Sequence, residues 1–190
     1  MRWNRHVPGI FDDRGFTIVE ASIYALLIMV VAGFALVNIR GILPRMQANE
    51  ALAQTVAQLR SGREQAIAQR RIVELRFLGT NEIRLIRYDQ PAGTTVLSTV
   101  TLDNRIEFAR FGGIPDTPDA FGASAAVDFN GRAPLYFQSD GTLADALGSP
   151  VSGSIFMGEL GHPETARAVT ILGATGRVRG YVWTGNAWVH

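Results

Sequence analysis

Residues 15–39 read GFTIVEASIYALLIMVVAGFALVNI, and no charged side chain occurs from Ala21 to Ile39. As an α-helix rising ~1.5 Å per residue, this uncharged stretch reaches about 28 Å, close to the ~30 Å hydrocarbon core of a bilayer. Its apolar residues are not confined to one stripe, so the pattern indicates burial on all sides of the helix. We therefore predict a membrane-spanning helix here.

Two other interpretations fit this stretch less well. A secretory signal peptide has an apolar region of about 7–15 residues, followed by a cleavage site of small residues. Here the apolar run is longer, and the residues that follow it, RGILPR at 40–45, offer no such site. A helix in the core of a soluble domain is the second alternative, but such a helix rarely stays uncharged over this length.

An acidic residue, Glu20, lies inside this hydrophobic block, after Phe16, Ile18 and Val19. An ionisable group at membrane depth is costly, which favours a functional role with a specific partner. The alternative is a glutamate whose carboxylate extends to the polar surface of the membrane while its stem stays in apolar surroundings.

The sequence GFTIVE at 15–20, followed by a long apolar helix, resembles the processing site of type IV prepilins and type II secretion pseudopilins. The resemblance implies that a prepilin peptidase cuts between Gly15 and Phe16 and methylates the new amino terminus of Phe16. It also implies that Glu20 neutralises this amine on a neighbouring subunit during filament assembly. Such an ion pair is worth several times more in a low-dielectric medium than in water.

The same resemblance implies a single-pass protein of the bacterial inner membrane, with a periplasmic head, that later enters a pseudopilus or pilus filament. The implied partners are other pilin or pseudopilin subunits, the prepilin peptidase and the inner-membrane assembly platform.

One residue departs from the family pattern, because many pilins have a proline where this chain has Val37. The candidates for a loosened or kinked helix are therefore Gly33 and the segment 41–44, which contains Pro44.

After Pro44 the apolar residues narrow to one helical face, which predicts an amphipathic helix. The residues that share this face are Ala48, Leu52, Val56, Leu59, Ala66 and Ile67. We expect four segments: a leader (1–15), a transmembrane and filament-core helix (16–39), an amphipathic helix that continues into the head (40–71) and a β-rich periplasmic head (72–190).

From Ile72 onward the apolar period changes to two, which predicts strands. The expected strands are 73–77, 83–85, 96–102, 105–111, 127–130, 135–138, 154–157, 168–172 and 178–183. A loop rich in Gly, Pro, Ala and Asp spans 112–126, and the last two strands form a hairpin that turns at 173–176. One substantial helix before a run of strands predicts an α+β fold, with a long N-terminal helix packed on an antiparallel sheet as in pilins.

Two sequences in the predicted head indicate a particular class within this family. The sequences LYFQSDG at 135–141 and TGRVR at 175–179 resemble the GspH/FimT class of minor pseudopilins and pilins. The absence of cysteine favours this class over major pilins that close a C-terminal disulfide loop. The sequence leaves open whether the filament is a secretion pseudopilus or a type IV pilus, and whether the subunit lies at its tip or in its shaft.

Enzymatic chemistry has little support in this sequence. There is no cysteine, the three histidines are far apart, and no Gly-x-Ser-x-Gly, phosphate loop or His-Glu-x-x-His motif occurs. The pairs Asp116 with Asp119 and Asp140 with Asp145 lack the dense spacing of oxygen ligands in a calcium loop. Turn-forming aspartates are the better interpretation. We therefore expect a protein that is not an enzyme and has neither a metal site nor a cofactor.

The C-terminal sequence GRVRGYVW at 176–183 suggests an alternative function. In a strand, Arg177, Arg179, Tyr181 and Trp183 share one face. Two guanidinium groups beside two aromatic rings suit phosphate contacts and stacking on bases. Some FimT-like pilins that take up DNA in natural transformation carry a Gly-Arg-x-Arg motif here, which these residues resemble. The structural alternative is that the arginines pack on the rings as cation–π contacts.

Overall fold

The structure is a computed structural model that describes residues 17–102 and 105–190, and between 34 and 41 the backbone alone. Helix α1 spans Ile18–Gln69 and contains Pro44. Strands follow it, together with one short 3-10 helix, η1 (Pro163–Thr165). The chain forms two compact units, residues 1–41 and residues 42–190, so that α1 contributes to both.

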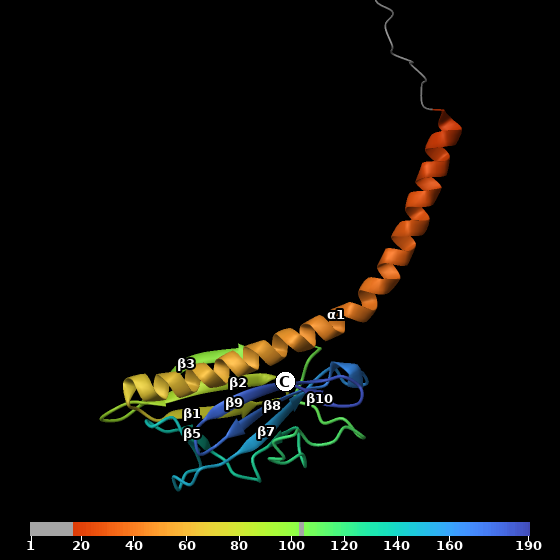
Figure 1. Ribbon diagram of the computed structural model, residues 1–190. Coiled ribbons are helices and arrows are strands. Elements are labelled where there is room, and N and C mark those ends of the chain that lie inside the picture. The colour runs from red at the N-terminus through yellow and green to blue at the C-terminus, as the bar shows by residue number, and fades with distance from the viewer. Residues whose placement is uncertain (1–16, 103–104) are drawn as a thin grey trace, which may run out of the picture. The chain divides into compact units, whose positions relative to one another are not determined.

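The second unit, which we call the head, contains two antiparallel sheets of five strands each (Figure 1). Sheet 1 has the order β3 (Thr94–Thr101), β2 (Glu82–Tyr88), β1 (Val73–Leu78), β5 (Leu135–Phe137), β6 (Leu143–Ala144). Sheet 2 has the order β10 (Trp188–Val189), β9 (Arg177–Trp183), β8 (Arg167–Leu172), β7 (Gly153–Met157), β4 (Val127–Asp128). Both are built mainly from hairpins, because most neighbours in the sheets are also consecutive in the chain.

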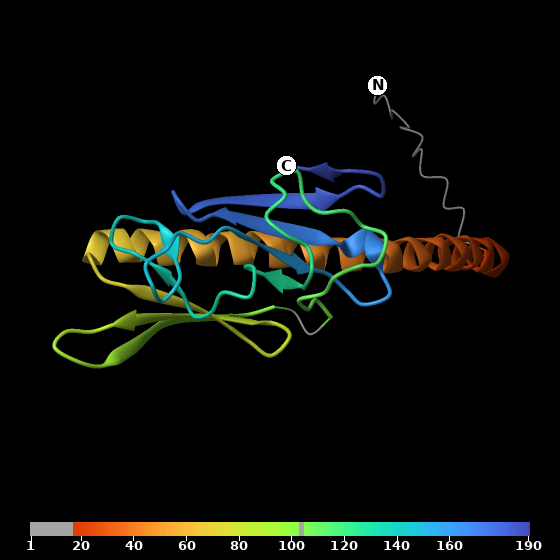
Figure 2. The same cartoon turned by 90° about the horizontal axis from the view of Figure 1, so that it is seen from below.

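Within the head, α1 lies across both sheets (Figure 2). A side chain added at Gly62 of α1 would meet Leu85 of β2 and Phe137 of β5, both in sheet 1. On sheet 2, a side chain added at Gly180 of β9 would meet Leu52 of α1 at 3.2 Å. The helix and the two sheets therefore enclose one apolar core, whose largest fully buried side chains include Leu59, Ile83, Leu85, Phe137, Ile155, Met157 and Ile171.

Small residues let α1 approach the sheets closely. Ala48, Ala51 and Ala66 are buried on this face, whereas Ile67, expected on the same face, is 39% exposed near the end of the helix. A buried arginine, Arg167 at the start of β8, fixes the helix to sheet 2, because its Nε donates a hydrogen bond to Oδ1 of Asn49 at 2.9 Å. Burial lowers the pKa of Arg167 below its ordinary value.

The predicted α+β class, a long N-terminal helix packed on antiparallel β-structure, is confirmed. The prediction that residues 105–111 form a strand is wrong. The amide of Phe108 donates to Thr80 in the turn after β1, whereas those of Glu107 and Ala109 donate to Gly158 and Phe156 in and beyond β7. Because these bonds go to separate segments, only an isolated bridge between Glu107 and Gly158 results. The predicted strand 127–130 is shortened to β4, and the sequence missed the two-residue strands β6 and β10.

Candidate functional site: the start of α1 and the arginines of β9

The start of α1 is defined by a capping interaction. Thr17 precedes the first helical residue, and its Oγ1 accepts a hydrogen bond from the backbone amide of Glu20 at 3.2 Å. Glu20 is thus the third residue of the helix, where a negative charge is favourable because it faces the positive end of the helix dipole. The pattern Thr-x-x-Glu would have predicted this cap. Gly15 and Phe16, the predicted cleavage and methylation site, lie outside the described residues.

The first unit has an apolar surface that its own described residues do not cover. Every residue from Thr17 to Gly33 is exposed. Large side chains among them have exposed fractions of 87% for Ile18, 55% for Leu27 and 73% for Met29. Isolated exposed apolar residues are common on proteins, but a continuous apolar surface indicates an interaction site. Across residues 17–102 and 105–190, the length and apolar character needed to cross a membrane do not occur together in any helix.

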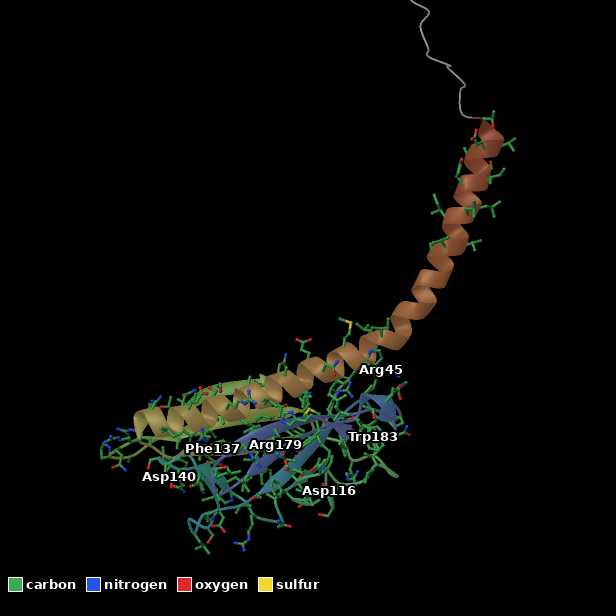
Figure 3. The ribbon with its side chains drawn as sticks, in the orientation of Figure 1. Arg45, Asp116, Phe137, Asp140, Arg179 and Trp183 are labelled. Carbon is green, nitrogen blue, oxygen red and sulfur yellow. The ribbon has the colours of Figure 1, made fainter. Side chains whose placement is uncertain are left out.

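Strand β9 presents the two predicted arginines in different surroundings. Arg179 lies within the head, beneath α1 in the view of Figure 3. Gly180 faces α1, so Arg179 and Tyr181 lie on the opposite face of sheet 2, as the alternation of the strand predicts. That face is covered by the loop 112–126, which contains no helix or strand. Arg177, at the first position of β9, is exposed and lines a hollow beside α1 instead.

Asp119 of this loop is the centre of a hydrogen-bonded cluster. Its Oδ1 accepts from Nη1 of Arg179 at 2.8 Å, and its Oδ2 accepts from Thr170 Oγ1 at 2.6 Å and from the Tyr181 hydroxyl at 3.0 Å. Burial alone would raise the pKa of the Asp119 carboxyl, but the hydrogen bonds from Thr170 and Tyr181 and the charge of Arg179 outweigh it and lower this pKa. The carboxylate therefore stays ionised and fastens the loop to β8 and β9.

This cluster changes how the C-terminal arginines are interpreted. Arg179 is already paired with a carboxylate, and Tyr181 is only 4% exposed, so neither presents a free group to a base or a phosphate. The ring of Trp183 stacks edge-on with that of Trp188, with centroids 5.3 Å apart. The sequence could not reveal Asp119 as the partner of Arg179, because 60 residues separate them along the chain.

The other aspartates considered as calcium ligands act within their own turns. Oδ1 of Asp116 accepts from the amide of Thr117, and Oδ1 of Asp140 accepts from that of Thr142. Oδ1 of Asp145 accepts from two amides, and its Oδ2 pairs with Arg132. In the part of the chain that the structure describes, no three histidine or acidic side chains are grouped so as to hold a metal ion.

A helix that crosses two antiparallel sheets defines the class of fold. The described residues have a pilin-like fold, in which an N-terminal helix packs on antiparallel sheets. The chain is similar to the type IV minor pilin FimU of Pseudomonas aeruginosa, with 14% identity and a TM-score of 0.51 over 77% of this chain and 95% of that one. It is also similar to the minor pseudopilin EpsH of the Vibrio cholerae type 2 secretion system, with 16% identity and a TM-score of 0.49 over 72% of this chain and 97% of that one. No protein-family model and no curated protein matches the sequence.

Proposed function

We propose that this protein is a minor pseudopilin or pilin of the GspH/FimT type, with a structural rather than an enzymatic role. A prepilin peptidase removes residues 1–15 and methylates the amino terminus of Phe16. Residues 16–39 hold the subunit in the bacterial inner membrane, and the head lies in the periplasm. An assembly platform then moves the subunit into a type II secretion pseudopilus or a type IV pilus.

The observation that carries the proposal is the combination of a pilin-type head with the sequence GFTIVE at the start of its long helix. Neither is sufficient alone, because a fold hosts many functions and a short motif recurs by chance. The uncharged sequence from Ala21 to Ile39 supports the membrane anchor.

The mechanism of assembly is non-covalent. Helices in a membrane already lie in an apolar medium, so their association depends on close van der Waals packing of one apolar surface against another. The exposed apolar residues of the first unit supply such surface to equivalent helices of neighbouring subunits. Glu20, near the start of the same helix, then meets the amine of a neighbour's Phe16, and this ion pair fixes the register between the two helices.

Processing is tested by mass spectrometry of the protein isolated from membranes of its host. The expected product lacks residues 1–15 and begins with methylated Phe16. Recovery of the intact amino terminus from cells with an active prepilin peptidase would contradict the proposal.

Assembly is tested by replacing Glu20, first by alanine and then by glutamine. Glu20→Gln keeps the shape of the side chain but loses its charge, and Glu20→Ala loses both. We expect both variants to be processed and inserted but to enter filaments at least about tenfold less than wild type, since an unpaired charge in apolar surroundings is costly. Glu50→Ala, which removes an exposed charge from α1 within the head, is the matched control and is expected to assemble normally.

The alternative function, DNA binding through Arg177 and Arg179, is less well supported. It needs both guanidinium groups to meet phosphates, and Asp119 already binds one of them. A protein with a formal net charge of +1 also lacks the positive surface potential on which nonspecific DNA binding depends. For these reasons we propose filament assembly in preference to DNA uptake.

A further inference from the structure

Three arginines surround one hollow at an end of the head. The hollow has a volume of about 250 Å³, and it lies between α1 and the first residues of β9. We call it the arginine notch, and its lining residues are Arg60, Arg63, Glu64, Gly176, Arg177 and Val178. Residues more than 100 positions apart in the sequence thus place three cations around one small volume.

The central arginine of the notch is held in place by the backbone of two turns. Nε of Arg63 donates to the carbonyl oxygens of Gly141 at 3.2 Å and of Thr175 at 3.0 Å. Gly176 has a φ of +61°, and a Cβ there would lie 2.1 Å from the Gly141 oxygen and 2.9 Å from Arg63 Nε. Only glycine fits this position. The two turns therefore close around the guanidinium group and fix its orientation.

The two outer arginines of the notch have no internal partner. Arg60 and Arg177 are both exposed. Among the described residues, neither side chain forms an ion pair or a hydrogen bond, in contrast to paired surface arginines such as Arg76 and Arg84. A fixed guanidinium flanked by two unpaired ones is suited to a carboxylate, which arginine binds through two parallel hydrogen bonds.

We propose that the arginine notch binds an acidic side chain on the head of a neighbouring filament subunit. This inference rests on the proposed function, and it adds a lateral contact between heads to the contact between helices. A carboxylate suits the notch better than a nucleic acid does. The hollow has a volume of about 250 Å³, which suits one acidic side chain, whereas binding of a nucleic acid depends on several cations that meet a run of phosphates along a surface.

The first test is the incorporation of a double variant, Arg60→Gln with Arg177→Gln, into filaments of the host. Because truncating one side of a desolvated charge pair weakens an interface strongly, we expect the ratio of this subunit to the other filament subunits to fall about tenfold. The control, Arg70→Gln with Arg105→Gln, removes the same charge from two exposed arginines that do not line the notch and is expected to assemble as wild type. Thermal unfolding of wild type and of the two double variants checks that the heads remain folded.

The second test maps the partner directly. The chain has no cysteine, so Arg177→Cys provides a unique attachment point for a photoactivated benzophenone in the full-length protein. Irradiation of assembled filaments is expected to yield a cross-link to a neighbouring subunit within a few residues of Asp or Glu. The same label at Val96→Cys, on the exposed part of β3, is expected to give different products.

These experiments separate failure of the notch from failure of the proposed function. If wild type enters filaments and the Arg60/Arg177 double variant does so equally well, the notch proposal falls and the filament role stands. If wild type itself is absent from filaments, the proposed function and the notch proposal both fall. A third outcome is that the double variant assembles normally, while purified wild type retards a double-stranded oligonucleotide at low salt and the purified double variant does not. In that case the notch is a nucleic-acid site and the proposal is overturned.

Discussion

The residues of α1 from Ile18 to Gly33 and those from Ile42 to Gln69 belong to one helix but have different surroundings. The first set is exposed throughout. In the second set, the face turned to the sheets is buried, with Leu59, Ala48 and Ala66 at 0% exposure. Among the described residues, one part of the helix thus packs its apolar side chains against the sheets, whereas the side chains of the other part are left exposed.

Residue size accounts for much of this difference. The buried face in the head includes Gly62 and several alanines, which allow the helix backbone to come close to the sheets. The exposed part has instead the consecutive large residues Leu26, Leu27, Ile28 and Met29, which project in all directions. The comparison teaches that apolar character alone does not distinguish a helix face that packs in the protein's own core from an apolar surface that stays exposed. The periodicity of the apolar residues and their size make this distinction.

The largest expected effect comes from truncating matched leucines in the two parts. Leu59→Ala leaves a cavity in the core and is expected to reduce the free energy of unfolding of the head by about 3 kcal/mol. Leu27→Ala, at a side chain that is 55% exposed, is expected to leave this free energy unchanged and to reduce filament incorporation. Denaturant unfolding of the full-length protein in detergent measures the first quantity. Equal destabilisation by the two variants would show that the two parts of α1 do not differ in their contribution to the stability of the head.

A smaller effect is expected from adding atoms at matched glycines. A Cβ at Gly62 would lie 2.9 Å from Cδ2 of Leu85 and 3.2 Å from Cδ2 of Phe137, whereas at Gly33 it would meet nothing within 4 Å. Gly62→Val is therefore expected to destabilise the head by about 1–3 kcal/mol through overpacking. Gly33→Val serves as its control, with an expected change below about 0.5 kcal/mol. Thermal melts followed by near-UV circular dichroism distinguish these outcomes, and an unaltered melt of Gly62→Val would argue against close packing.

The smallest effect concerns the polar contacts of the head. Asp119→Asn is expected to cost about 1–2 kcal/mol, because Arg179 loses its charged acceptor. The pKa of Asp119 is lowered in the folded protein, so its contribution is present above the ordinary aspartate pKa and is lost as pH falls through the lower, folded value. The difference in stability between wild type and Asp119→Asn should thus be present at pH 7 and shrink in acid. A difference that does not depend on pH would show that the charge has no role.

Much of the head was predictable because its strands are long enough to show a period. Strands β1, β7, β8 and β9 appear close to their predicted bounds, whereas β2 (Glu82–Tyr88) extends beyond the predicted 83–85. The prediction of a strand at 105–111 was wrong, because the buried residues Ile106 and Ala109 are three positions apart and the hydrogen bonds of this segment go to several others. The strands β6 and β10 contain two residues each, which is too few for any alternation to be visible.

The candidate sites also differ in how far the sequence could predict them. The motif around Glu20 is local, so the sequence was sufficient to propose it, including its place in the first turn of a helix. The partner of Arg179 and the companions of Arg177 were not predictable. Asp119 lies in a loop without periodicity, and Arg60 and Arg63 lie on α1, more than 100 positions before Arg177.

The class of fold was predictable from the sequence by itself, and so were the proposals of a change in character along the long helix and of a cleavage site before it, because these depend on hydropathy, periodicity and local spacing. Tertiary structure alone decided which arginines are free. Sheet pairing and the loop over sheet 2 bring Asp119 to Arg179, while two glycine turns bring Arg177 to Arg63. Electrostatic interactions depend on distance in space, which separation along the chain does not reveal.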